Sequence, residues 1–191
     1  MSKKKTPSNK YVEELVSKSQ KGDADAFAEL YDIFSNQIYR YIYYKVNKSD
    51  VEDLTEMLFL KAWENINKYQ NRKKTTFKSW LYRIAHNLVV DHYRLSREHS
   101  SLDPRLSSTD RVANPKEMVQ ESLNNENLKK AISKLKKSYQ QIIILKFINE
   151  LSNSEISDIL KKSEGNVRIL QFRALKALRR ILLEMGVEYA E

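Results

Sequence analysis

Glycine and proline are almost absent from this chain, which has 3 of each among 191 residues. Strands and tight turns rely on these two residue types, so the sequence offers few points at which a sheet could turn back on itself. Residues that favour helices are abundant, and apolar residues recur at helical spacing along most of the chain. The chain is therefore predicted to be all-α.

The charge balance favours an acidic partner. Lys and Arg number 34 against 25 Asp and Glu, which gives a formal net charge of +9. Because there is no cysteine, no disulfide or thiolate zinc site can form, and this fits a cytoplasmic protein. No apolar run exceeds about four residues, whereas a membrane helix needs about 20, so we expect no membrane span.

The helical periodicity stops between residues 96 and 115, a stretch that holds five serines and two of the three prolines. It ends in Asn114-Pro115-Lys116-Glu117, which combines a capping residue, a proline suited to the first helical position and a glutamate able to reach a free N–H group. We therefore predict two unlike helical domains joined by a flexible linker. The basic tail, first domain, linker and second domain span residues 1–9, 10–97, 98–125 and 126–191.

Positive charge is concentrated in two places. Residues 68–97 carry eight Lys or Arg against one Asp, and residues 126–191 carry thirteen against eight acidic residues. Two basic surfaces on tethered domains favour two contacts along one polyanion. Basic faces also serve solubility alone, and for any single run this alternative stays open.

The second domain contains a start signal for a short helix. Ser152 and Glu155 have the spacing of a capping box, and Leu151 and Ile156 have the spacing of a hydrophobic staple. The helix that begins here is predicted to end near Leu160.

A second helix is predicted to follow after a short turn. The chain breaks at Lys161-Lys162, and Ser163 is a good cap for a helix that continues to about Leu183. Two helices joined in this way present the second one to the major groove of DNA. The pattern therefore predicts a DNA-binding helix-turn-helix.

On a helical wheel, this last helix divides into an apolar stripe and an opposite basic face. The predicted core stripe is Val167, Leu170, Ala174, Leu178 and Ile181. Arginines on the opposite face suit guanine edges or phosphates, and the two apolar residues there suit thymine methyls, with packing against the first domain or a partner protein as the alternative. The candidate DNA-binding residues are Ser163, Gly165, Arg168, Ile169, Phe172, Arg173 and Lys176.

Apolar spacing predicts three helices in the first domain. One begins near Gly22-Asp23, a second at Ser49-Asp50-Val51-Glu52 with capping-box spacing, and a third runs from about Phe77 to Leu95. The core stripes of the first two are Phe27, Leu30, Phe34, Ile38, Tyr41 and Ile42, and Leu54, Leu58, Ala62 and Ile66. The third is expected to pack through Phe77, Leu81, Ile84, Leu88 and Leu95.

A basic and polar loop at residues 68–76 precedes the third helix, and aromatic residues are interleaved with the charges around it. Because amines neutralise phosphate while rings stack on unpaired bases, this composition favours single-stranded nucleic acid. Aromatic residues at helical spacing also serve as core, and that alternative stays open. The stripe that the third helix leaves exposed is predicted to be Trp80, Arg83, Asn87, Asp91 and Arg94.

Three segments carry family motifs. They are Asp53 to Trp63, the pattern Phe77-x-x-Trp80-Leu81-x-x-Ile84-Ala85-x-Asn87-x-x-x-Asp91-x-x-Arg94, and Ser152 to Ala174. In this order they resemble the polymerase-binding helix and the promoter-melting helix of sigma region two, and the helix-turn-helix of region four. The family is the extracytoplasmic-function (ECF) sigma factors of bacterial RNA polymerase.

The resemblance implies a sigma factor that binds core RNA polymerase at the β′ clamp coiled coil and the β flap and directs promoter-specific initiation. The last helix then reads the minus-thirty-five element of promoter DNA, and an anti-sigma factor is a further candidate partner. The implied polymerase-binding residues are Asp53, Glu56, Phe59, Leu60 and Trp63. The implied minus-ten DNA-binding residues are Lys78, Trp80, Tyr82, Arg83, Asn87 and Arg94.

Other function classes fit the sequence less well. A stand-alone helix-turn-helix repressor or activator leaves the basic, aromatic surface of the first domain without a use, and a sigma-like regulator remains the alternative. An enzyme is not expected, because His86, His92 and His99 are widely spaced, have no carboxylate cluster and form no convincing metal or general-base site. No cofactor is expected.

Overall fold

The computed structural model describes residues 7–71, 75–100 and 119–186, with side chains described for 7–71, 75–95 and 126–186. Its regular elements are all helical within these ranges, which confirms the predicted all-α class. The first domain contains α1 (Asn9–Ser19), α2 (Ala24–Tyr43), the 3-10 turn η1 (Lys48–Asp50), α3 (Val51–Asn65), the 3-10 turn η2 (Ile66–Lys68) and α4 (Phe77–Ser100). The second contains α5 (Val119–Ser133), α6 (Lys137–Ile143), the π-helical turn η3 (Ile144–Ile148), α7 (Asn153–Leu160) and α8 (Glu164–Glu184).

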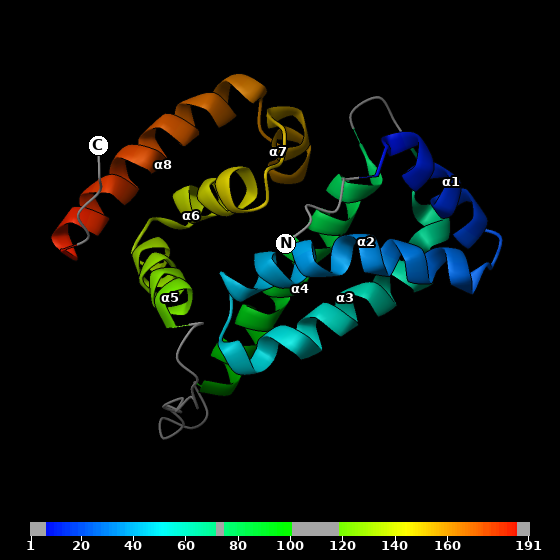
Figure 1. The fold of residues 1–191 in the computed structure, drawn as a ribbon, viewed down its shortest axis with the longest axis horizontal. Coiled ribbons are helices and arrows are strands. Elements are labelled where there is room, and N and C mark those ends of the chain that lie inside the picture. The colour runs from blue at the N-terminus through cyan, green and yellow to red at the C-terminus, as the bar shows by residue number, and fades with distance from the viewer. Residues whose placement is uncertain (1–6, 72–74, 101–118, 187–191) are drawn as a thin grey trace.

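The first domain packs α1, α2, α3 and α4 around one apolar core (Figure 1). Capping side chains mark the starts of its first two helices. Ser8 caps α1, and Asp23 caps α2 by accepting a hydrogen bond from the Ala26 N–H over 3.0 Å. Gly22, with φ of 92°, makes the tight turn between α1 and α2, which an L side chain would strain. The predicted stripes of α2 and α3 are buried, apart from Phe27, which is partly buried.

Three local predictions for this domain are wrong. The start of α3 has no capping box; η1 precedes it, and the Asp50 side chain makes no capping bond. α4, which is the third helix predicted from the sequence, continues past Leu95 to Ser100, so the break in apolar periodicity does not mark its end. Leu95 itself is 55% exposed, because this end of α4 extends beyond the helices that cover its beginning.

The second domain lies against the first (Figure 1). The side of α7 packs on the beginning of α4, and η3 lies near α2. Near the other end, Lys129 of α5 donates a hydrogen bond to the Val46 carbonyl over 3.1 Å and lies 4.1 Å from the centre of the Tyr43 ring. α5 begins at Val119, inside the segment predicted as linker, and the predicted start signal at 114–117 lies outside the described residues.

Within the described ranges, none of the helices has an apolar stretch of the length and hydrophobicity that crossing a bilayer requires.

Candidate nucleic-acid interface

The predicted helix-turn-helix is formed by α7 and α8. Ser152 caps α7 in a complete capping box with Glu155, and the staple residues Leu151 and Ile156 are both fully buried. α7 ends at Leu160, and the next residue, Lys161, has a left-handed backbone with φ of 51°. Lys161 thus forms the turn predicted at Lys161-Lys162. A left-handed residue at the end of a helix is usually glycine, but here it is lysine.

The last helix exposes the face that the helical wheel predicts. Ser163 caps α8 by accepting a hydrogen bond from the Asn166 N–H over 3.3 Å. Of the predicted core stripe, Val167, Ala174, Leu178 and Ile181 are buried and Leu170 is partly buried. The opposite face is exposed at every candidate residue, namely Ser163, Gly165, Arg168, Ile169, Phe172, Arg173 and Lys176.

Two features of this face fit a macromolecular partner. Phe172 is 72% exposed, the largest exposure among the large apolar side chains that the structure describes, and Ile169 is 51% exposed beside it. A Cβ added at Gly165 would meet nothing within 4 Å, so the space in front of this backbone is open. Among the described residues, Arg168 forms one long ion pair, with Glu164 at 3.7 Å, which leaves its guanidinium available.

The residues predicted for minus-ten DNA fall on separate faces of α4. Trp80 and Asn87 line a hollow of about 310 Å³ between α3 and α4. Its basic and polar rim comes from Lys61, Asn65 and Lys68, and its apolar wall from Ile84 and Leu88, with Asp91 beside them. Arg94 is exposed further along α4. The hollow thus joins an aromatic side chain, amide groups and amines, which are the groups that bind an unpaired base and its phosphate.

Tyr82 does not belong to this surface. Its ring is fully buried and meets the Tyr41 ring edge to face, with ring centres 5.4 Å apart. Burial raises the pKa of the Tyr82 phenol, and no described group bonds to its hydroxyl. Tyr82, which the resemblance implied as a minus-ten DNA-binding residue, is instead a core residue, because the core alternative for aromatic residues at helical spacing applies here.

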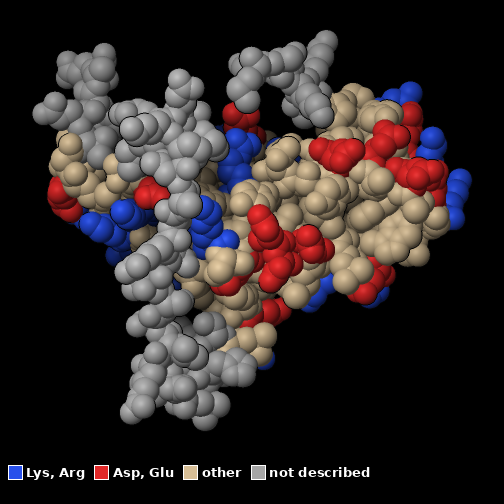
Figure 2. All heavy atoms as spheres, turned by 60° about the horizontal axis from the view of Figure 1, so that its bottom comes forward, with Lys and Arg blue, Asp and Glu red and all other residues tan. Residues whose placement is uncertain are grey.

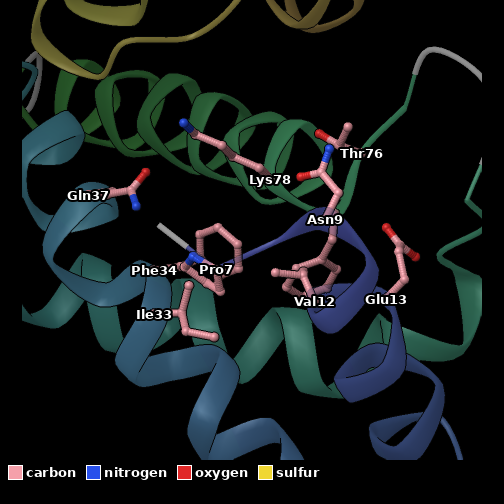
Figure 3. A pocket seen from close by; sticks show the side chains of 10 residues that line it. Pro7, Asn9, Val12, Glu13, Ile33, Phe34, Gln37, Thr76 and Lys78 are labelled. Carbon is pink, nitrogen blue, oxygen red and sulfur yellow. The ribbon is translucent and has the colours of Figure 1, made fainter. Parts of the chain in front are cut away.

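Lys78 and Arg83 lie on the side of α4 that faces α7. Arg83 forms an ion pair with Asp158, with Nη2 and Oδ2 2.5 Å apart. Lys78 lines a second, smaller hollow where the beginnings of α1 and α4 meet α2 (Figure 3). Burial lowers the pKa of the Lys78 ammonium, while Glu155 and Glu150 partly offset this effect.

The predicted polymerase-binding helix presents a mixed acidic and apolar face. Asp53 and Glu56 are exposed on α3 together with Glu52, and acidic side chains gather on the face of the molecule shown in Figure 2. Met57 and Leu60 are exposed at 44% and 58%. This combination of charge and bare apolar surface is typical of a docking site.

Two residues predicted for this docking face are turned inward. Phe59 is only 5% exposed and packs against the Tyr31 ring, with ring centres 4.6 Å apart. Trp63 is partly buried and packs against Phe27, with ring centres 5.0 Å apart. Phe59 is thus a core residue that supports the face, a correction that follows from the neighbouring helix α2, which the motif alone does not reveal.

Comparison with known proteins matches both domains. Residues 30–98 match the family model of Sigma-70 region 2, and residues 125–178 match that of Sigma-70, region 4. The chain is 31% identical over 185 residues to the ECF RNA polymerase sigma factor SigW of Bacillus subtilis, covering 91% of this chain and 98% of SigW. It is 40% identical over 174 residues to the ECF RNA polymerase sigma factor BldN of Streptomyces coelicolor, covering 88% of this chain but 65% of BldN.

The fold is also that of a solved sigma factor. RpoE from Bartonella quintana, in complex with the anti-sigma factor NepR, superposes with a TM-score of 0.69 at 20% identity, covering 82% of this chain and 96% of RpoE. The chain belongs to the extracytoplasmic-function sigma factors of bacterial RNA polymerase. Sigma factors bind core polymerase and direct promoter-specific transcription initiation, and this is the function of the chain.

Proposed function

We propose that three surfaces divide the work of initiation. The exposed acidic and apolar face of α3 binds core polymerase at the β′ clamp coiled coil, while the second domain sits on the β flap. The first part of α4, with the hollow between α3 and α4, binds the melted minus-ten strand. The open face of α8 reads the duplex minus-thirty-five element.

The observation that carries this assignment is the exposed face of α8. Arg168, Ile169 and Phe172 lie opposite a buried stripe on the second helix of a helix-turn-helix. Arg168 is placed to reach guanine edges or phosphate, and the two apolar residues to reach thymine methyls. Phe172 is 72% exposed, so DNA that covered its ring would remove apolar surface from water, which is favourable.

The hollow between α3 and α4 supports the minus-ten role. Opening the duplex and turning a base outward costs a few kcal/mol, and a pocket that binds the unpaired base offsets this cost. Trp80 supplies a ring, Asn87 an amide, and Lys61 and Lys68 charge for the backbone. Binding and strand separation need no bond to be made or broken by the chain, so its proposed role is non-enzymatic, and its place is the cytoplasm, where polymerase and promoter meet.

An anti-sigma factor is a further proposed partner. The chain shares the fold of RpoE, which was solved with the anti-sigma factor NepR. The exposed Leu60 and Phe172 faces are surfaces that such an inhibitor would cover to block polymerase and DNA together.

Run-off transcription with purified core polymerase on a promoter library tests the α3 surface and the α8 surface separately. Asp53→Ala should weaken binding to core polymerase by about two- to fivefold, as expected for an exposed charge. Arg168→Ala and Phe172→Ala should leave core binding unchanged and shift the preferred upstream element, at a cost of about 1–3 kcal/mol for a base contact. Lys21→Ala, which removes an exposed charge between α1 and α2, is the matched control.

Two outcomes would contradict the proposal. If all three variants start transcripts like the parent chain and Lys21→Ala, the site assignments are wrong. If the parent binds promoter DNA specifically but never changes the start positions of core polymerase, the alternative of a stand-alone regulator applies.

A further inference from the structure

Two acidic side chains of α7 lie on the beginning of α4. Asp158 accepts hydrogen bonds from Arg83 over 2.5 Å and from the Ser79 hydroxyl over 3.3 Å. Glu155 accepts one from the Thr76 hydroxyl over 3.3 Å. The contact joins residues 75 to 79 positions apart, so it connects the two domains and does not belong to either one alone.

This contact covers the basic start of α4. The Arg83 side chain is 35% exposed and Asp158 is 21% exposed, so the pair is partly removed from water. Ser79 is buried, and Lys78 is partly buried near Glu155. The proposed DNA face of α8 differs, because its arginines and Phe172 remain open.

The groups that hold the two carboxylates are those that bind nucleic-acid backbone. An arginine guanidinium and the hydroxyls of serine and threonine are common donors to phosphate oxygens. A carboxylate presents similar acceptor oxygens and the same sign of charge. Asp158 and a DNA phosphate therefore compete for Arg83, and the negative charge of Asp158 repels a phosphate placed there.

We propose that Asp158 and Glu155 form an intramolecular clasp that holds the free chain closed and shields the start of α4 from nucleic acid until the domains separate. This inference rests on the minus-ten role proposed above for α4. Partly exposed ion pairs shift an equilibrium by only about two- to fivefold, which is strong enough to favour closure and weak enough for core polymerase to reverse.

The distance between the domains tests the clasp without polymerase or DNA. Because the chain has no cysteine, Asn36→Cys in α2 and Leu183→Cys in α8, both exposed, provide two spin-label sites. Double electron–electron resonance should give one narrow distance distribution for the labelled parent. Asp158→Asn should broaden it toward longer distances, whereas Asp32→Asn, which removes an exposed carboxylate of α2, should not.

A charge swap separates the clasp from a loss of folding. The double variant Arg83→Asp with Asp158→Arg should restore the narrow distribution that Asp158→Asn alone loses. Circular dichroism should show the same helix content in all variants. A distribution for Asp158→Asn equal to that of the parent and Asp32→Asn would overturn the proposal.

Binding of a fluorescein-labelled single-stranded oligodeoxynucleotide of mixed sequence tests the shielding. Asp158→Asn should bind it about two- to fivefold more tightly than the parent and Asp32→Asn do. A broader distance distribution with equal, measurable affinities would overturn the shielding claim. If no variant binds the oligonucleotide while the distance still lengthens, the clasp is confirmed and the role proposed for α4 fails.

Discussion

Gln171 of α8 donates a hydrogen bond from Nε2 to Oδ1 of Asn153, the first residue of α7, over 2.7 Å. The bond is partly buried and joins the two helices of the helix-turn-helix across 18 positions of sequence. Gln171 neighbours Phe172, which points outward. The bond therefore helps to fix the angle at which α8 presents its exposed face.

Replacing Gln171 with leucine should lower the free energy of unfolding by about 1 kcal/mol, because one partly buried hydrogen bond is lost and Asn153 loses its partner. Thermal or urea denaturation measures the change. Phe172→Ala is the control, since its exposed side chain contributes little to the fold; a larger loss for Phe172→Ala than for Gln171→Leu would contradict this account.

Gly165→Ala separates fold from recognition. An added Cβ meets nothing within 4 Å, and alanine favours helix over glycine by up to about 1 kcal/mol, so stability should be unchanged or raised. If DNA backbone approaches this point closely, affinity for a minus-thirty-five duplex should fall. Fluorescence anisotropy with that duplex decides, and unaltered affinity would show that Gly165 lies outside the contact.

Tyr82→Phe should keep or raise stability and leave promoter opening intact. The hydroxyl of Tyr82 is buried without a described partner, which costs roughly 1–3 kcal/mol, and the ring contact with Tyr41 survives the change. Denaturation and permanganate footprinting of the opened promoter measure the two effects. If Tyr82→Phe lost promoter opening while its stability was unchanged, the Tyr82 hydroxyl would have a role in DNA binding.

Lys45 gives stability a pH dependence. Burial, and secondly the charge of Lys137, lowers the pKa of the Lys45 ammonium to about 8 from 10.5. The unfolded chain therefore binds this proton more tightly, and the contribution of Lys45 to stability rises with pH between about 8 and 10.5. Lys45→Met should raise stability at pH 7 by up to about 3 kcal/mol and remove this slope.

Denaturation of parent and Lys45→Met at several pH values from 7 to 10 measures the difference. Lys21→Met, at an exposed position, controls for the loss of a charge alone. A constant difference between parent and Lys45→Met across this range would contradict the assignment.

Salt should weaken DNA binding steeply, because each neutralised phosphate releases counterions. Lys176 is exposed on the open face of α8, so Lys176→Ala should reduce the slope of log affinity against log salt by about 0.9. Lys21→Ala should leave the slope as in the parent. Titrations of duplex promoter DNA at several salt concentrations test both.

The sequence pattern predicted those features that depend on residues close together along the chain. The exposed face of α8 and the capping box at Ser152 follow from spacing within one or two helical turns, and both are present. Tyr82 and Phe59 were misplaced because their burial depends on Tyr41 and Tyr31 of another helix. The contact of Arg83 with Asp158 spans 75 positions, and no local spacing encodes it.

Glu155 uses its two carboxylate oxygens for different purposes. Oε2 accepts from the Ser152 backbone and hydroxyl at the start of α7, and Oε1 accepts from Thr76 in the other domain. A substitution at Glu155 that removes the bond to Thr76 also removes the capping bonds to Ser152. Among the described residues, Asp158 bonds only to side chains of α4. We therefore expect related chains whose two domains separate more or less readily to differ at position 158 and to keep Glu155.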